Sequence, residues 1–379
     1  MLQIDIAIAG IERKLDYGEE VISTREALHE DLYFSLLELF QRRAGKPAGD
    51  RTLRPGQIVP NVVASDGSTR VSVYLSSQRT AAPLQLPAPE LAQLERPLHP
   101  DEVSALLRPL HGERFGCLSW QGRAVEGLYQ PGTLPGLVIS AGQHANESSG
   151  VVGALRAAQA LQQQPGAHYA LVALENPDGA TLHHTLCQSN ARHMQHAARF
   201  TALGDDLEAR QGPPLGEKAA RQEAIARTQA GLHFSLHGYP AHEWTRPFSG
   251  YLPPGSEDWT LPKGFFLILR QHPGHDGWAF LQALTAALAQ DPALREFNAR
   301  QQALWRAHWG ELPYPVLNGI ACLVSEDQRS RVPFTLISEF PDETIYGEAF
   351  RLAHETQTRT VLLGAQLYWQ GLLGDQRTA

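Results

Sequence analysis

In the stretch LVISAGQHANE, residues 137–147, a short apolar run leads directly into two side chains that bind metals well. The first five residues, with only one serine among them, predict a buried β-strand. His144 and Glu147 follow in the next bend, three positions apart. An imidazole and a carboxylate at this spacing can close on one ion, and zinc suits a mixed nitrogen and oxygen pair. The stretch therefore predicts two ligands of a zinc site just past the end of a strand.

The size and composition of the chain set limits on what it can be. Its 379 residues exceed the size at which one hydrophobic core usually keeps growing. A hydrophobic content of 42% with 19% charged residues is typical of a globular protein. The net charge of -8, without a basic stripe, argues against nucleic acid as a partner. The 3 cysteines are odd in number and widely spaced, which favours a reducing compartment over a disulfide framework.

The apolar segments of the sequence give no sign of export or membrane insertion. Residues 1–13 lack a basic region followed by a long apolar core, so we expect no signal peptide. No apolar stretch approaches the length of a membrane span, so we expect no membrane partner. Together with the low cysteine content, these features predict a cytoplasmic protein. The pattern says nothing about oligomeric state.

The first eighty residues predict a small α+β unit. Apolar residues alternate along Leu2–Ile8, which is the period of a half-buried strand. Ser23 and Glu26 form a capping box at the start of an amphipathic helix. Two valine-rich segments flank Asp66-Gly67, a pattern typical of a β-hairpin. We therefore place a small N-terminal α+β domain at residues 1–80.

A proline-rich stretch at residues 81–99 predicts a linker, and the pattern changes after it. From residue 100 onward, strand-like apolar runs alternate with helical ones. The predicted strands lie at residues 136–141, 169–174, 232–236, 265–269, 320–324 and 334–338. Such alternation indicates a sheet covered by helices on both faces, where ligands collect at the strand ends. We interpret residues 100–379 as one α/β catalytic domain.

Two further strand-end residues complete a candidate hydrolytic site. His237 follows the run at residues 232–236 and precedes Gly238-Tyr239-Pro240, which we interpret as a turn. Two histidines and one glutamate are a common protein ligand set of catalytic zinc. Glu339 ends another apolar run and is the candidate general base. Glu343 competes with it but lies in a polar stretch. Taken singly, each residue also fits a structural role, such as a core histidine, a helix cap or an ion pair.

Four segments of the chain resemble, in the same order, motifs of the M14 zinc carboxypeptidases. They are GQHANE at 142–147, LENPDG at 174–179, LHGY at 236–239 and ISE at 337–339. The resemblance covers roughly residues 100–370 and implies a mixed eight-stranded sheet flanked by helices. It also implies one Zn²⁺ per chain, a peptide or small amide substrate, and four site residues. These are the zinc ligands His144, Glu147 and His237, and the base Glu339. The Asn176–Gly179 segment is also a good turn on physical grounds.

The chain departs from this family at one point. Its carboxypeptidases usually hold the terminal carboxylate of the substrate with an Asn-Arg dipeptide, which this chain lacks. The resemblance places Arg192 about where an arginine polarises the scissile carbonyl, and a plain surface arginine is the alternative. Further candidates for substrate binding are Arg199, Tyr239, Arg246 and Tyr314.

Three functions remain open at this stage. The first is a zinc-dependent peptidase or amidase, specifically a metallocarboxypeptidase. The second is an N-acyl-amino-acid amidohydrolase, because His-Ala-Asn-Glu is similar to the His-Gly-Asn-Glu of aspartoacylase and succinylglutamate desuccinylase; the Asn-Pro-Asp-Gly segment favours the peptidases. The third is an inactive binding protein, against which the complete ligand set argues. For the N-terminal unit, we expect an interaction or substrate-restricting module.

Overall fold

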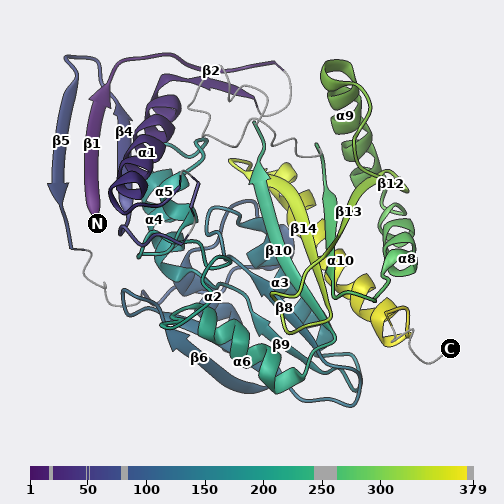
Figure 1. Ribbon diagram of the computed structural model, residues 1–379. Coiled ribbons are helices and arrows are strands. Elements are labelled where there is room, and N and C mark those ends of the chain that lie inside the picture. Colours follow the sequence, from purple (N-terminus) through teal and green to yellow (C-terminus); the bar gives the residue numbers. More distant parts are fainter. Residues whose placement is uncertain (17–19, 48, 51, 78–83, 243–262, 374–379) are drawn as a thin grey trace.

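The computed structural model describes the chain except for residues 17–19, 48, 51, 78–83, 243–262 and 374–379. Within the described residues, nine strands form one mixed sheet at the centre of the molecule (Figure 1). In spatial order they are β12 (Val316–Leu317), β13 (Ile320–Glu326), β11 (Phe266–Gln271), β14 (Phe334–Glu343), β10 (Leu232–Pro240), β8 (Leu137–Ala141), β9 (Tyr169–Val172), β7 (Ala124–Gln130) and β6 (Glu113–Leu118). The predicted mixed sheet is confirmed, with nine described strands in place of eight and only two residues in the edge strand β12.

Helices cover both faces of this sheet, as the alternating pattern predicted. On one face, α3 (Ser149–Leu161) and α10 (Glu348–Trp369) pack together, and α8 (Trp278–Leu288) packs on α10. On the other face, α6 (Lys218–Thr228) packs on β6, β7, β8 and β9. The remaining helices are α2 (Pro100–Leu107), α4 (Pro177–Cys187), α5 (His196–Arg199), α9 (Pro292–Trp309) and the short 3₁₀ helix η1 (Leu91–Gln93). Strand β8 is buried on both sides, which explains its continuous apolar run.

The N-terminal region forms a separate sheet with one long helix. Strand β1 (Leu2–Ile8) lies between β4 (Ile58–Ala64) and β5 (Arg70–Leu75), and β2 (Glu12–Lys14) pairs with β3 (Val21–Ser23). The predicted hairpin is wrong, because β4 and β5 each pair with β1 instead of with each other. The connection at residues 65–69 is long enough to cross the roughly 10 Å that separates two strands on either side of a third.

Helix α1 (Thr24–Arg43) begins where the sequence predicted. The Ser23 hydroxyl accepts a hydrogen bond from the Glu26 N–H at 3.1 Å, which is the N-cap contact. The second half of the expected capping box is absent from the described contacts of Glu26. Its carboxylate instead accepts hydrogen bonds from residues more than a hundred positions away. The helix start is therefore local, but its first acidic side chain serves a tertiary contact.

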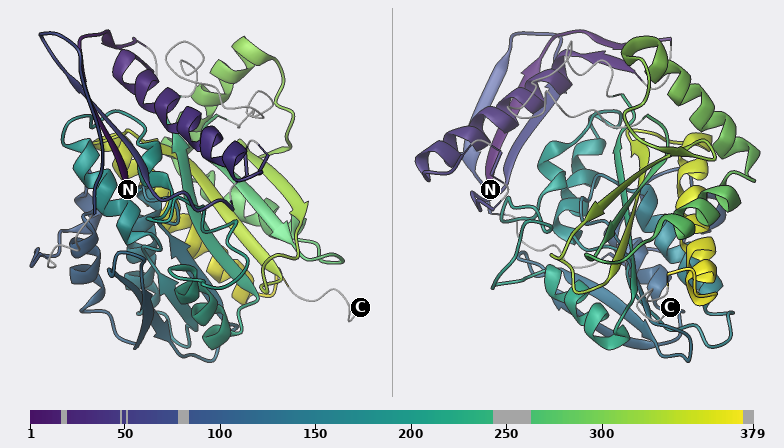
Figure 2. Two further views of the ribbon diagram at one scale, coloured as in Figure 1. Left: turned by 60° about the vertical axis from the view of Figure 1, so that its left-hand side comes forward. Right: turned by 45° about the vertical axis from the view of Figure 1, so that its right-hand side comes forward.

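The N-terminal unit shares a hydrophobic core with α4 and α5 of the rest of the chain. Ile4 and Ile58 of the small sheet and Tyr33 of α1 pack in one cluster with Leu182 and Leu186 of α4. Figure 2 shows the N-terminal elements lying along one side of the molecule next to these helices. Within the predicted linker, Leu91 and Leu94 are buried in the main core. The proposed domain boundaries stay a prediction, but the two regions pack tightly against each other.

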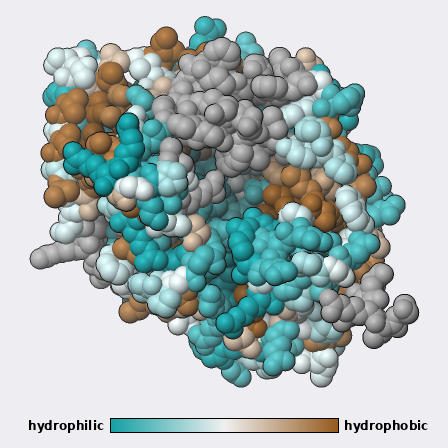
Figure 3. Space-filling model, in the orientation of Figure 1, coloured by the Kyte–Doolittle hydropathy of each residue, from teal (hydrophilic) through white to brown (hydrophobic). Residues whose placement is uncertain are grey.

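The surface of the N-terminal sheet carries exposed apolar side chains on β5. Val71, Val73 and Leu75 are all exposed, and Figure 3 shows a hydrophobic area where β1 and β5 lie. They pair across the sheet with Ile6, Ile4 and Leu2, so they continue the same face beyond the part that α1 covers.

None of the described helices combines the length and the apolar character that crossing a membrane requires.

Candidate metal centre

Three neighbouring parallel strands, β8, β10 and β14, bring the predicted ligands to one edge of the sheet. Leu236 of β10 lies opposite Ala141, the last residue of β8. His237 is therefore the first residue of β10 beyond the end of β8, next to the bend that carries His144. The predicted turn at residues 238–240 is wrong, because β10 continues to Pro240 with an irregularity after Gly238. The strand itself, with its alternating side chains, aims His237 at the site.

The bend after β8 presents His144 and Glu147 from one short loop. Gly142 has a φ of 62°, and a Cβ atom there would lie 2.7 Å from Leu174 Cδ1, so only glycine fits this sharp change of direction. The Glu147 N–H then donates to the His144 carbonyl at 3.2 Å, which closes the turn before α3 begins. Both side chains consequently project toward the same space.

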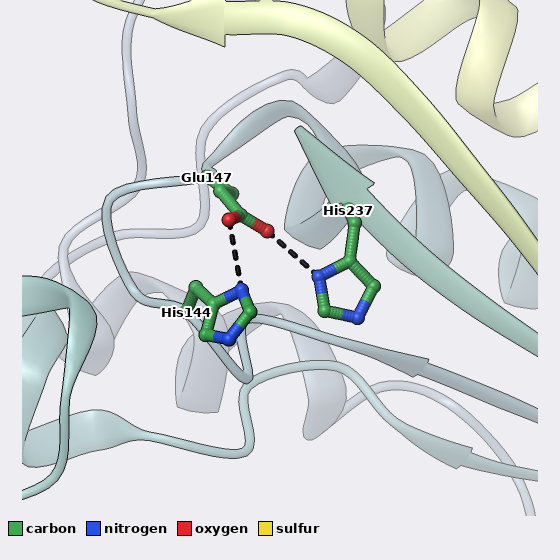
Figure 4. Close-up of side chains that lie close together, drawn as sticks. All are labelled: His144, Glu147 and His237. Atoms are coloured by element: carbon green, nitrogen blue, oxygen red, sulfur yellow. Dashed lines mark hydrogen bonds and ion pairs between the residues drawn. The ribbon is translucent and has the colours of Figure 1, made fainter. Parts of the chain in front are cut away.

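The side chains of His144, Glu147 and His237 converge on one point, as Figure 4 shows. His144 Nδ1 lies 2.8 Å from Glu147 Oε1, and His237 Nδ1 lies 2.8 Å from Glu147 Oε2. One ligand atom from each residue lies within 4.8 Å of the other two. Tetrahedral ligands about 2.0–2.2 Å from zinc stand roughly 3.3 Å apart, so a small outward shift makes room for an ion. The donor set and its spacing fit zinc.

The outer nitrogens of the two histidines contact polar groups on the far side of each ring. His144 Nε2 lies 3.4 Å from Asp206 Oδ1, and His237 Nε2 lies 3.1 Å from the Ser235 hydroxyl. A metal-binding histidine usually donates its second N–H to such an outer partner, which fixes the tautomer and the ring orientation. Both rings are therefore held with Nδ1 facing Glu147. Asp206 lies outside any helix or strand, so no periodic pattern in the sequence indicates it.

An arginine also reaches this cluster, and it is Arg199 of α5. Arg199 Nη1 donates to Glu147 Oε1 at 2.5 Å. Arg192, the residue that the sequence suggested for the scissile carbonyl, is exposed. The structure thus brings Arg199 to the predicted ligands and places Arg192 at the surface.

The charges within the cluster compensate one another. Burial opposes ionisation of Glu147, but His144, Arg199 and His237 hold the pKa of this carboxylate well below its usual 4.5. Burial and Arg199 both lower the pKa of His144, yet Glu147 and Asp206 outweigh them and raise it above 6.5. The site is consequently an ionised network that a divalent cation can enter by displacing protons from imidazole.

Glu339 lies beside the cluster on the neighbouring strand. It stands opposite His237 in the parallel register of β10 and β14, so the two side chains share one face of the sheet. Burial raises the pKa of Glu339 well above 4.5, and the negative charge of Glu147 raises it further. Glu339 does not end its strand, because β14 runs on to Glu343. The prediction that Glu339 ends the strand and that Glu343 lies in a polar stretch beyond it is therefore wrong. The two glutamates differ in their contacts instead.

Two other carboxylates of β14 serve contacts with the loop that holds the ligands. Glu343 Oε2 accepts a hydrogen bond from Asn146 Nδ2 at 2.7 Å, within the His144–Glu147 turn. Asp342 Oδ2 accepts one from the Ser149 N–H at 2.7 Å, at the start of α3. Burial raises the pKa of Asp342 to about 8. Residues 342–344 form a polar stretch in the sequence, and their alternation alone does not indicate that β14 continues through them.

The remaining predicted substrate residues do not gather at the cluster within the described structure. The Tyr239 hydroxyl donates to the Gly264 carbonyl at 2.7 Å, and its ring packs on Phe266 in a buried group. Tyr314 is half-buried between α9 and the edge strand β12, which three strands separate from β10. Arg246 lies outside the described residues.

The Asn-Pro-Asp-Gly segment begins a helix instead of forming an isolated turn. Asn176 is the N-cap of α4, its Oδ1 accepts from the Gly179 N–H at 2.9 Å, and Pro177 occupies the first helical position. Asn176 Nδ2 donates to the Phe200 carbonyl at 3.1 Å. The same residue types favour both motifs, and the following helical residues decide between them. The segment thus supports the backbone next to Arg199.

No family model matches the sequence, and no curated protein sequence matches it. Solved structures similar to this chain include a metallo-carboxypeptidase from Burkholderia cenocepacia, at 13% identity and a TM-score of 0.44, over 72% of this chain and 70% of that one. A metallo-carboxypeptidase from Pseudomonas aeruginosa has 19% identity and a TM-score of 0.40, over 72% and 69%. The murein-tripeptide amidase of Escherichia coli O157 has 16% identity and a TM-score of 0.35, over 66% and 90%.

Proposed function

We propose that this protein is a zinc-dependent hydrolase that cleaves a peptide or amide bond. The observation that carries the proposal is the convergence of His144 Nδ1, the Glu147 carboxylate and His237 Nδ1 on one point. These three residues would hold one Zn²⁺, and three protein ligands leave a fourth position for water or substrate. A bound zinc ion would supply a water whose pKa is lowered to about 7, and it would polarise the scissile carbonyl.

Glu339 is the residue we assign to proton transfer. Its carboxylate shares a sheet face with His237 and is half-buried beside the ligands. Burial and the nearby charge of Glu147 raise its pKa, which suits a group that must take up a proton near neutral pH and release it again. We propose that a Glu339 carboxylate oxygen accepts the proton of the attacking water and passes it to the leaving amine.

Arg199 is the residue we assign to the negative charge that develops on the carbonyl oxygen. Its guanidinium contacts Glu147, so it already occupies the space beside the ligands. The neighbouring carboxylates raise its pKa against the effect of burial, so it stays protonated. A fixed positive charge in a buried site stabilises such an oxyanion by a few kcal/mol, about 2.7–4 for one well-placed donor. This assignment replaces Arg192.

The metallocarboxypeptidase form of this proposal rests on the four ordered segments that resemble the M14 enzymes. The lack of an Asn-Arg dipeptide leaves the recognition of a free carboxylate without its usual residues. N-acyl-amino-acid hydrolysis is therefore the second candidate. Both activities use the same ligand set, so substrate choice separates them.

The experiment is a metal-reconstituted assay. The protein is stripped with a chelator, reloaded with one equivalent of Zn²⁺, and tested on benzoylglycyl dipeptides with free C-termini, on their C-terminal amides, and on N-acyl amino acids. We expect hydrolysis of at least one peptide series that disappears on chelation and returns with zinc. Hydrolysis of N-acyl amino acids alone would select the second candidate. Failure to bind stoichiometric zinc would remove both.

A further inference from the structure

Helix α1 lies against the segment at residues 190–200, which ends at Arg199 and Phe200. The aromatic ring of Tyr33 is parallel to that of Phe200, with centroids 5.8 Å apart and an angle of 2° between the planes. It also stacks on His196 at 5.9 Å and 16°. Tyr33 is 3% exposed, so these contacts are fully enclosed. Tyr33 of α1 thus contacts one residue that precedes Arg199 in the sequence, His196, and one that follows it, Phe200.

A polar contact from Glu26, at the start of α1, holds the same segment at Met194. Glu26 Oε1 accepts hydrogen bonds from the Met194 N–H at 2.9 Å and from His242 Nε2 at 2.6 Å. His242 follows strand β10, and its Nδ1 lies 3.2 Å from the Thr344 hydroxyl after β14. Burial opposes ionisation of Glu26, but His242 lowers its pKa to about 2. A buried carboxylate therefore joins the segment to the ends of the two strands that carry His237 and Glu339.

Further contacts distribute this attachment along the segment. His193 Nε2 lies 2.9 Å from Glu12 Oε1 and 3.2 Å from the Ser23 hydroxyl. Arg25 Nε donates to Asn190 Oδ1 at 3.3 Å. The three partners of the segment in these contacts, Glu12, Ser23 and Arg25, all belong to the N-terminal unit. Because residues 190–195 form no helix or strand, side chains from outside the segment largely determine its path.

We propose that the N-terminal unit is a positioning element of the active site, and that Tyr33 and Glu26 are positioning residues that hold Arg199 against the metal centre. The inference rests on the proposed function, because it assigns Arg199 a role in the reaction. Arg199 is placed through α5 and Phe200, which Tyr33 contacts directly. The N-terminal unit then constrains the position of a catalytic residue, whether or not its surface also binds a partner.

The first test measures the segment itself and needs no substrate. Tyr33→Leu removes the stacked ring, while Tyr33→Phe keeps the ring and serves as the matched control. We expect zinc-loaded, full-length Tyr33→Leu to show amide hydrogen exchange at residues 190–200 at least roughly tenfold faster than the wild type, with unchanged exchange in β8 and β10. Tyr33→Phe should match the wild type. Equal protection of the segment in Tyr33→Leu and wild type would overturn the proposal.

The second test links the contact to Arg199 through kinetics on a benzoylglycyl dipeptide. We expect Tyr33→Leu and Glu26→Gln to lower kcat by about tenfold to 10²-fold with KM little changed and zinc content retained. Neither change should lower activity further in the Arg199→Ala background, since the group they position is gone. Ser35→Ala, an exposed residue of the same helix, is the control.

The two ways to fail are distinguishable. Additive losses in the Arg199→Ala background would show that α1 acts elsewhere, and would overturn the positioning role while leaving the hydrolase intact. A protein that hydrolyses nothing after zinc loading would overturn the proposed function, and the kinetic role of Tyr33 with it. In that case, faster exchange in Tyr33→Leu would still show that Tyr33 holds the segment in place, without a role in catalysis.

Discussion

Two buried regions of this molecule contain histidine–glutamate pairs, and they differ in how the pairs are arranged. At the strand ends, one carboxylate, Glu147, contacts both His144 and His237. Where the N-terminal unit packs on the rest of the chain, which we call the α1 interface, Glu26 of α1 contacts His242 at 2.6 Å and Glu12 of β2 contacts His193 at 2.9 Å. These are two separate pairs. Short contacts are thus common to both regions, and Glu26, His242 and His193 are as buried as the strand-end residues, whereas Glu12 is exposed. Only the strand-end region brings three ligand atoms within reach of one ion among the described residues.

Convergence, more than residue type, therefore distinguishes the candidate metal centre from the ionic contacts. Parallel strands supply this convergence, because β8, β10 and β14 end at one edge of the sheet. In the other region, β2 and α1 pack on parts of the chain that lie outside helices and strands, and Glu12 and Glu26 each contact one histidine. Four predictions test this difference, in order of expected effect.

The largest effect is expected from removing the shared carboxylate. Glu147→Gln should abolish stoichiometric zinc binding and all hydrolysis, because both histidines lose the ligand between them and Arg199 loses its partner. Elemental analysis after dialysis against zinc checks this. The matched control is Glu26→Gln, an equally buried histidine partner, which should retain one zinc per chain. Equal metal loss in the two variants would show that the interface pairs also bind metal.

The next effect separates the two glutamates of β14. Glu339→Gln should keep zinc and lower kcat by about 10²–10⁴-fold, because the proton acceptor is lost while the ligands stay in place. Glu343→Gln should keep far more activity, since Glu343 contacts Asn146. Rates on the best peptide substrate, measured at equal zinc content, decide the matter. A greater loss in Glu343→Gln would transfer the base role to that residue.

A smaller loss is expected for the arginine that the structure brings to the ligands. Arg199→Ala should reduce kcat by about 10²–10³-fold. Arg192→Ala, a change at an exposed side chain, tests the original assignment and should have little effect. Steady-state kinetics on the same peptide compares them directly. The reverse order would restore Arg192 as the residue that stabilises the oxyanion.

The smallest effect concerns stability at the α1 interface. Burial lowers the pKa of His29 to about 4, and the positive charge of His196 adds to this. The unfolded chain therefore binds a proton between about pH 6.5 and 4 that the folded protein does not, so this residue costs stability as pH falls through that range. At pH 5 the cost is on the order of 2 kcal/mol.

His29→Gln should remove this component of acid sensitivity. Urea unfolding at pH 7 and pH 5 measures it, and the wild type should lose more stability between the two than the variant. Activity at pH 7 should stay unchanged. An identical pH dependence in both proteins would mean that His29 titrates normally, and that the interface tolerates its protonation.

The grouping of the three candidate ligands was predictable from the sequence, because each of them lies in or just after an apolar run that is easy to recognise. The spacing of His144 and Glu147 after one strand, and the place of His237 in another, indicated the ligands before their geometry was known. Resemblance to ordered family motifs then joined segments that composition alone leaves separate. The start of α1 at Ser23 was predictable for the same reason, since an N-cap depends on a few adjacent residues.

The errors arose where local patterns are ambiguous. Asp66-Gly67 fits a hairpin, but β1 pairs with both neighbouring segments and separates them. Glycine and proline after His237 suggested a turn, although β14 supports the strand through Pro240. Choosing between Arg192 and Arg199 required the path of an irregular segment, which has no period to read.

The amino-acid order by itself determined the candidate ligand types, the strand runs and a helix cap, because these are properties of short segments. Only the tertiary structure decided which arginine meets those ligands and what the N-terminal unit contacts. Those facts depend on pairs such as Tyr33 with Phe200 and Glu26 with His242. Their partners lie more than 160 positions apart, and the free energy that joins them comes from burial and packing that no local pattern records.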